Sequence, residues 1–256
     1  MTTEAAATVT WNYSALARPY LKRPDYSEGG LDAMLAIAKT PAGATLCDIG
    51  AGLGHLTVPL ARRGFTLTAV EPNDEMRALG VERTREMSNV SWCKGTGEAT
   101  GCDSDAFDFV SFGSSFNVTD RAQALKETHR LLRSGGWFAC MWNHRDLDDP
   151  IQVDVENIIR SFIPNYDYGT RREDQTRVIV ESGLFDTPFR IEAPVLHTVE
   201  VADWVEAWRS HATLDRQSNG RLNEIVDAIQ AYFDKRGDRE IVVPYTTRIW
   251  VARAKK

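Results

Sequence analysis

Three glycines at alternate positions, Gly50, Gly52 and Gly54, follow a short apolar run, Thr45–Ile49. A strand, a glycine loop and a helix start place backbone N–H groups where they can hold an anion or a polar ligand. A Cβ at these glycines would intrude on that ligand. The spacing is G-x-G-x-G, because His55 stands where the dinucleotide fingerprint G-x-G-x-x-G needs its last glycine. The loop therefore favours a polar ligand whose anchored group is not a pyrophosphate.

A carboxylate follows at the end of the next predicted strand, Phe65–Val70. Glu71 comes 17 residues after Gly54, at a strand tip where a carboxylate can accept hydrogen bonds from both hydroxyls of a ribose. The alternative is an acid that stabilises the start of a helix after Pro72. Strand, loop and acid fall in register, which favours the ribose role and hence a nucleoside-containing ligand.

The elements that position these residues alternate between strand and helix. Pro41 and Gly43 end a first amphipathic helix, and Ser134-Gly135-Gly136 closes the helix before the last apolar run. Five strands separated by helices predict a doubly wound α/β sheet. The predicted strands are Thr45–Ile49, Phe65–Val70, Val90–Cys93, Phe107–Phe112 and Trp137–Trp142, and the predicted helices are Gly30–Lys39, Leu56–Arg63, Glu75–Glu86 and Ala122–Leu132.

The alternation lapses after Pro150. Helical patterns then surround one strand-like run, and the chain ends in a further alternating stretch with Pro244 inside it. No linker separates these parts, so we expect a single domain over residues 1–256, with an N-terminal lid at 1–40 and helical cap insertions at 151–188 and 202–238. The predicted helices are Ile151–Phe162, Gln175–Ser182 and much of Ala202–Arg236, and the predicted strands are Phe189–Val201 and Val242–Arg253.

Several motifs, in order, resemble the class I S-adenosylmethionine-dependent methyltransferases. They are Cys47–Gly54, Val70-Glu71-Pro72 with Met76, Gly95–Ala99, Phe107–Val110 and Leu131–Gly136. Trp142–Asp146, Val243–Thr247 and the early tyrosines resemble the small-molecule branch that includes trans-aconitate methyltransferase-like and methyltransferase type 11-like proteins. The resemblance covers roughly residues 13–253. It implies a Rossmann-like seven-stranded sheet and S-adenosylmethionine as the cofactor.

The resemblance also implies roles around that cofactor. One group wraps its methionine end, Glu71 holds the ribose hydroxyls, and others line the adenine or lie under the sulfonium. Arg23 is a candidate partner for the cofactor carboxylate, which an arginine fork matches in geometry. The implied cofactor residues are Tyr20, Arg23, Asp48, Gly50, Ala51, Gly52, Gly54, Glu71, Pro72, Met76, Thr96, Gly97, Glu98, Gly113 and Ser114.

Methyl transfer requires a nucleophile aligned in a water-excluded pocket, with or without a base. His144, after the fifth strand, and His211, among tryptophans, are the candidate bases, and loss of the proton to water is an equal alternative. Asn117 could orient an acceptor but cannot deprotonate it. Family members often carry His-Trp where this chain has Asn117-Val118, so close family comparison does not define the substrate.

Aromatic residues gather where a lid and a pocket are expected. An apolar pocket with few polar anchors suits a small, flat, largely hydrophobic acceptor, and the alternative is that half of these residues are core. We expect methylation of an O, N or C atom of an aromatic or natural-product-like molecule, as in secondary metabolism. The predicted substrate-binding residues are Trp11, Tyr13, Asn117, Trp208 and Tyr245.

Composition limits the other functions. Lys plus Arg is 30 against 36 Asp plus Glu, a net charge of −6, which disfavours a nucleic-acid partner. The longest apolar run, Trp137–Trp142, is far shorter than the roughly 20 residues that span a bilayer. The first ten residues do not resemble a signal peptide, and the four cysteines show no CxxC spacing, so a cytoplasmic protein with reduced thiols is expected. No ligand spacing for a metal is present, and we expect a monomer or weak homodimer acting on a small molecule.

Two alternative functions stay open. A nicotinamide-dependent oxidoreductase would share the ribose acid, although His55 counts against it. A module that binds S-adenosylmethionine without catalysis is the other, and Asn117 keeps it open.

Overall fold

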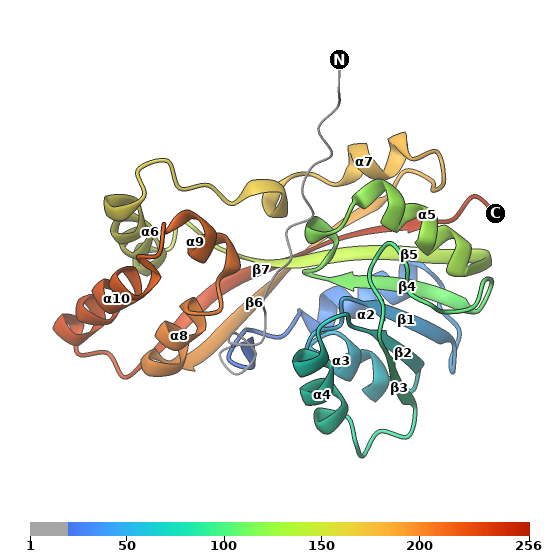
Figure 1. Cartoon of the computed structure of the whole chain (residues 1–256), viewed down its shortest axis with the longest axis horizontal. Coiled ribbons are helices and arrows are strands. Elements are labelled where there is room, and N and C mark those ends of the chain that lie inside the picture. The colour runs from blue at the N-terminus through green and yellow to red at the C-terminus, as the bar shows by residue number, and fades with distance from the viewer. Residues whose placement is uncertain (1–19) are drawn as a thin grey trace.

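A seven-stranded sheet forms the centre of the computed structural model, which describes residues 20–256, apart from the side chain of Ala212 (Figure 1). The first five strands in the chain are parallel, and the sixth and seventh form an antiparallel pair that joins at β5. The predicted fold class is confirmed. The strand order is β3 (Val90–Cys93), β2 (Thr66–Val70), β1 (Thr45–Ile49), β4 (Phe107–Gly113), β5 (Leu132–Arg145), β7 (Glu240–Arg253) and β6 (Phe189–Glu200).

Helices cover both faces of the sheet, which explains why its strands are apolar on both sides. Cys47 and Phe112 pack in one core with α5 (Arg121–Leu131) and α7 (Thr176–Glu181). The neighbouring strand positions Leu46 and Phe109 pack on the opposite face with α2 (Glu28–Ile37) and α3 (Thr57–Arg62). A further helix, α4 (Asp74–Arg83), lies against β3.

β5 is longer than its apolar run. It continues past Met141, the last residue that pairs with β4, and pairs with β7 as far as Arg145. The predicted strand ends at Trp142 because Asn143, His144 and Arg145 carry polar side chains, which the apolar pattern of a buried strand does not include. They are buried all the same, at 4–8 % exposure. The extension brings three polar side chains beyond the carboxyl edge of the parallel strands.

The cap stands on extensions of β6 and β7, which run together past the ends of β1 and β4 (Figure 1). Their outer pairs, from Val195 opposite Tyr245 to Glu200 opposite Glu240, carry helices at the same edge of the sheet. A third core, around Trp204 and Phe233, packs these helices together. The cap helices are α6 (Pro150–Phe162), α8 (Val201–Trp208), α9 (Ala212–Gln217) and α10 (Leu222–Arg236).

The residues before α2 join the cap to the sheet. Lys22 pairs with Asp203 of α8, while the Asn143 side chain donates hydrogen bonds to the carbonyls of Pro24 and Asp25. The first half of the predicted N-terminal lid, with Trp11 and Tyr13, lies outside the described residues. Within residues 20–256, no helix is long and apolar enough to cross a membrane.

Candidate active site

The glycine loop between β1 and α3 has the left-handed backbone that its glycines predict. Gly50, Gly52 and Gly54 have φ of 66°, 57° and 81°. A Cβ on Gly50 would lie 2.5 Å from Cβ of Ser115. Glycine is therefore required at this position both by conformation and by the close approach of the loop after β4.

Four amides of the loop already have acceptors within the protein. The amides of Gly50 and Ala51 donate to the carbonyl of Val70, Gly54 N donates to Ala51 O, and Gly52 N donates to Glu71 Oε2 at 2.8 Å. The expectation that these four amides are free to hold an anion is therefore wrong. Its glycines allow a ligand to approach the backbone closely. Its hydrogen bonds to Val70 and Glu71 hold the loop at the end of β2.

Asp48 supports the loop from beneath. Its side chain is fully buried, with Thr57 Oγ1 donating to Oδ2 at 2.6 Å and Ser111 Oγ donating to Oδ1 at 3.5 Å. Burial raises the pKa of this carboxyl to about 7, against the lowering effect of both hydroxyl groups. Asp48 thus ties β1 to the start of α3.

Glu71 lies at the tip of β2, with its orientation set by two backbone amides. Oε2 accepts from Gly52 N and Oε1 from Asn73 N, both at 2.8 Å. Burial raises the pKa of the carboxyl, while these hydrogen bonds lower it. Each carboxylate oxygen has two acceptor sites, so both keep capacity for a ligand hydroxyl.

The predicted adenine side consists of one apolar contact and one self-contained turn. Met76 is buried and packs with Leu53 and Tyr20. In the turn, Thr96 Oγ1 accepts from Ala99 N, and Glu98 Oε1 accepts from Asp120 N at 2.7 Å. The side chains of Thr96 and Glu98 therefore hold the backbone of the predicted adenine side through these hydrogen bonds. Pro72, at the start of the loop before α4, is exposed, and Gly97 lies against Thr119 and Phe112.

Ser114 connects the end of β4 to the segment before α2. It has a positive φ of 58°, and its hydroxyl lies 2.9 Å from the hydroxyl of Tyr26. Burial raises the pKa of Tyr26, which keeps this phenol protonated. A Cβ on the neighbouring Gly113 would meet Tyr26 Oη at 3.0 Å. This pair closes one end of a cavity.

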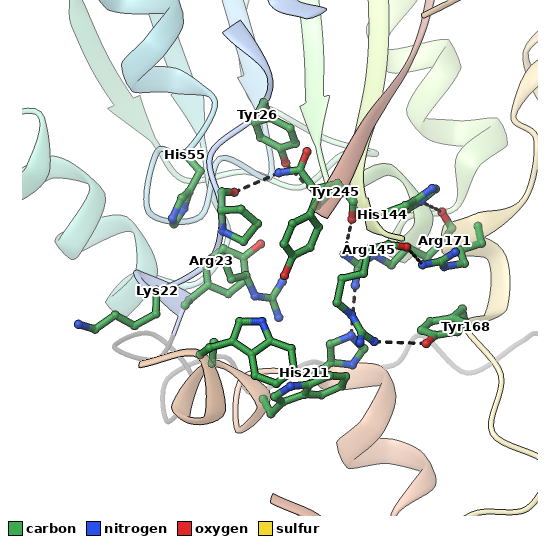
Figure 2. A pocket seen from close by; sticks show the side chains of 18 residues that line it. Lys22, Arg23, Tyr26, His55, His144, Arg145, Tyr168, Arg171, His211 and Tyr245 are labelled. Atoms are coloured by element: carbon green, nitrogen blue, oxygen red, sulfur yellow. Dashed lines mark hydrogen bonds between the residues drawn. The ribbon is translucent and has the colours of Figure 1, made fainter. Parts of the chain in front are cut away.

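The cavity lies between the sheet edge and the cap and holds about 850 Å³ of empty space, including solvent at its mouth (Figure 2). It brings together residues from the segment before α2, the β4 and β5 ends, the loop before α7, α8 and β7. Seven residues predicted from the sequence line it: Tyr20, Arg23, Ser114, His144, Trp208, His211 and Tyr245.

Asn117 is not among the lining residues. It lies in a 3-10 helix, η2 (Phe116–Val118), where its Oδ1 accepts from Trp142 Nε1 at 2.9 Å. The structure therefore gives its carboxamide oxygen a partner in the core instead of placing it with the other predicted acceptor residues.

The two candidate bases both line the cavity, in different hydrogen-bonding states. His144 Nε2 lies 3.1 Å from the carbonyl of Arg171, an acceptor that requires the proton on Nε2. Burial, with Arg171 and Arg172 nearby, lowers the pKa of His144 to about 3. His211 caps α9 by accepting from Leu214 N at its Nδ1, and burial lowers its pKa well below the ordinary value. Both imidazoles are neutral at pH 7.

Sequence reasoning missed most of the cationic side of the cavity. Arg145, Arg171 and Arg172 line it, as do Tyr26 and Tyr168. Arg145 follows His144 in a motif that was noted for its resemblance alone. Arg171 and Arg172 lie in η3 (Gly169–Arg172), a short 3-10 helix without hydrophobic periodicity. No metal-binding group of three or more His, Cys, Asp or Glu occurs in the described part of the chain.

Comparison with known proteins shows which part of the chain resembles a known domain. Residues 47–140 match the family model described as a methyltransferase domain. An uncharacterised methyltransferase of Mycobacterium tuberculosis is 37% identical over 125 residues, 48% of each chain. A ubiquinone/menaquinone biosynthesis C-methyltransferase of Zymomonas mobilis is 30% identical over 138 residues, 50% of this chain and 57% of its own. The chain thus aligns with about half the length of these curated relatives.

The solved structures agree on the fold. A putative type II methyltransferase from Anaeromyxobacter dehalogenans superposes with a TM-score of 0.61 at 18% identity, over 90% of this chain and 97% of the other. Residues 47–140 thus match a methyltransferase domain in sequence, as the motifs implied, and the described chain shares the fold of a solved methyltransferase structure. The chain's narrower likeness to trans-aconitate methyltransferase-like proteins stays a prediction.

Proposed function

We propose that this protein transfers the methyl group of S-adenosylmethionine to an O, N or C atom of a small organic molecule bound beneath the cap. The observation that carries the proposal is the continuity of the site. Ser114 follows β4 beside the loop held by Glu71, and it also lines the cavity that the cap closes. One cofactor and one acceptor can therefore meet at Ser114.

The cofactor would supply a methyl group already activated on a sulfonium. The glycine loop would receive its methionine part, Glu71 its ribose hydroxyls, and Met76, Pro72 and the Thr96–Glu98 turn its adenine. We keep the assignment of Arg23 to the cofactor carboxylate; its guanidinium stacks 4.0 Å above the Tyr20 ring and donates to the hydroxyl and carbonyl of Ser210. The chain's contribution to the reaction is then alignment and exclusion of water.

A base is required only for an acceptor that must lose a proton. His144 is neutral and its Nδ1 has no partner, so it could accept one, whereas both nitrogens of His211 already have partners in the protein. His144 has a second role, because its hydrogen bond to the Arg171 carbonyl holds η3 against β5. Trp208 and Tyr245 would enclose a flat acceptor, and we keep Trp11, Tyr13 and Asn117 as candidate acceptor residues. We also keep the cytoplasmic, monomeric or weakly dimeric assignment as part of the proposal.

Calorimetric titration with S-adenosylhomocysteine tests the cofactor. We expect saturable binding by the wild type and binding about 10- to 100-fold weaker in Glu71→Gln, because a charged acceptor of ribose hydroxyls is lost. Glu75→Gln removes an exposed acid from the same helix start and should leave the affinity unchanged. Thermal unfolding confirms that both variants fold. Binding of NAD in place of S-adenosylhomocysteine would support the oxidoreductase instead.

A further inference from the structure

Four arginines line the cavity. Arg23 precedes α2, Arg145 ends β5, and Arg171 and Arg172 belong to η3 (Figure 2). No Asp or Glu is among the residues that line the cavity. Within residues 20–256, none of these four guanidinium groups forms an ion pair with a carboxylate. The chain has a net charge of −6, so this cluster is a local reversal of charge.

Arg171 lies at the centre of the cluster. Its Nη2 donates to the carbonyl of Asn143 at 3.2 Å, and its Nη1 lies 3.4 Å from Nε2 of His211. A neutral imidazole has one acceptor nitrogen, so His211 can accept from Leu214 N at Nδ1 or from Arg171 at Nε2, but not from both. One of these two donors is therefore left without the ring as its acceptor. Burial and the neighbouring arginines lower the pKa of Arg171 to about 10, which leaves it charged at pH 7.

The neighbouring arginines have neutral partners. Arg145 donates to Gln152 Oε1 at 2.7 Å and to Tyr168 Oη at 3.2 Å, and lies 4.3 Å above the Trp208 ring. Arg172 donates to the carbonyl of Arg145. Glu156, which lies outside the cavity lining, accepts from the Tyr168 hydroxyl and is itself paired with Arg160.

Arg145 is buried and the other three are half-buried, and clustered cations withdrawn from water without counter-ions are unfavourable unless an anion joins them. The cofactor carries one carboxylate, and we have assigned it to Arg23, on the Tyr20 side. Arg171 contacts the carbonyl of Asn143 in β5 and the His211 ring before α9, in the cavity that Trp208 and Tyr245 also line. An anion held there belongs to a second ligand in the same cavity.

We infer that the acceptor is a small organic anion, whose carboxylate or phosphate is held by Arg171 beside His211, and whose flat apolar body lies among Trp204, Trp208 and Tyr245. This inference rests on the proposed function. The anion is an anchor that orients the molecule, because a guanidinium fork occupies its lone pairs. The atom to be methylated lies on the part of the molecule that faces Ser114.

The experiment measures binding to the complex of the protein with S-adenosylhomocysteine. The probes are small aromatic and aliphatic carboxylic acids, each paired with its primary amide, and the matching phosphate monoesters. In the wild type the best acid or phosphate should bind at least about tenfold tighter than its neutral partner, since a charged hydrogen-bonded pair is available. Which anion binds tighter distinguishes carboxylate from phosphate.

Arg171→Gln should reduce that preference to less than about threefold, and Arg171→Lys, which keeps the charge without the fork, should fall between. Arg209→Gln is the matched control, since Arg209 follows Trp208 but pairs with Glu206 and Asp227 outside the cavity. A wild type without preference for any anion overturns the inference. So does an Arg171→Gln variant that loses S-adenosylhomocysteine as strongly as it loses the acid, because Arg171 would then hold the cofactor.

Failure of the proposed function has a different signature. A wild type that binds no S-adenosylhomocysteine disproves the cofactor assignment, and the comparison of acids with amides is then made on the free protein. A preference for acids that depends on Arg171 would still support the anion site there, and its absence would refute it.

Discussion

Polar side chains beneath the glycine loop are occupied by the protein itself. Asp48 accepts from Thr57 and Ser111, and Glu71 accepts from two backbone amides. A buried carboxyl with few donors holds its proton more tightly than one in water. Asp48 therefore links the protonation of the protein to its stability, at a position where the motif alone suggested contact with a ligand.

The first prediction concerns the pH dependence of stability. The pKa of Asp48 is about 7 when folded, against an ordinary value near 3.8, so the folded protein binds this proton more tightly than the unfolded chain. The contribution of Asp48 to the free energy of unfolding is present below pH 4 and is lost as the pH rises to 7. Asp48→Asn removes the effect and retains an acceptor for Thr57.

Urea unfolding of the wild type and of Asp48→Asn between pH 4 and pH 8 measures this pH dependence. The free energy of unfolding of Asp48→Asn relative to the wild type should increase with pH, by on the order of 2–4 kcal/mol across the window. All other titrating groups are common to both proteins and cancel. A difference that stays constant with pH would contradict the account.

At the scale of elements, the sequence pattern predicted the strands and helices well where one side of each is buried in a regular core. It predicted β1, β3 and the order of the elements, because the apolar runs and glycines report on them directly. It did not predict the length of β5, since Asn143–Arg145 are polar and yet paired with β7. Nor did it indicate η3. The arginines of this short helix reach the cavity only because the cap and the sheet pack together, which no local pattern reports.

The glycine loop gives the second prediction. Gly50→Ala should lower the free energy of unfolding by more than about 2 kcal/mol, because the new Cβ combines a left-handed φ with a 2.5 Å approach to Ser115. Gly43→Ala is the control, with a φ of 72° and nothing within 4 Å of its Cβ position. It should cost only about 1 kcal/mol, for backbone strain alone.

Chemical denaturation of the two variants measures the difference. Equal losses of stability would show that the close approach of the β4 loop does not constrain Gly50, and the geometry given for the cofactor loop would need revision.

At the scale of the molecule, the cap and the sheet have separate cores. Trp204, Ile229, Phe233 and Val243 pack within the cap, while two other clusters fill the faces of the sheet. The sheet with its cofactor motifs could be predicted from local patterns along the first 145 residues. The acceptor cavity could not, since its walls are contributed by elements whose relative positions depend on the long pairing of β6 with β7.

Because the cap and the sheet have separate cores, we expect the cap to unfold locally while the sheet stays folded. In hydrogen–deuterium exchange, amides of α8 and α10 should exchange faster than those of β1 and β4, because the cap can unfold locally while the central strands exchange only on opening of the sheet. An acceptor bound between Arg171 and Trp208 should slow the exchange of α8. Identical exchange rates in cap and central strands would contradict this division.

The most direct test of the account is transfer of a labelled methyl group. The protein is incubated with S-adenosylmethionine that carries labelled methyl, together with the acid or phosphate that binds it best, and products are separated and counted. We predict one equivalent of S-adenosylhomocysteine for each labelled small molecule, with turnover greatly reduced in Arg171→Gln. Tight binding of both ligands without any transfer of label would contradict the proposed methyltransferase and leave a binding module.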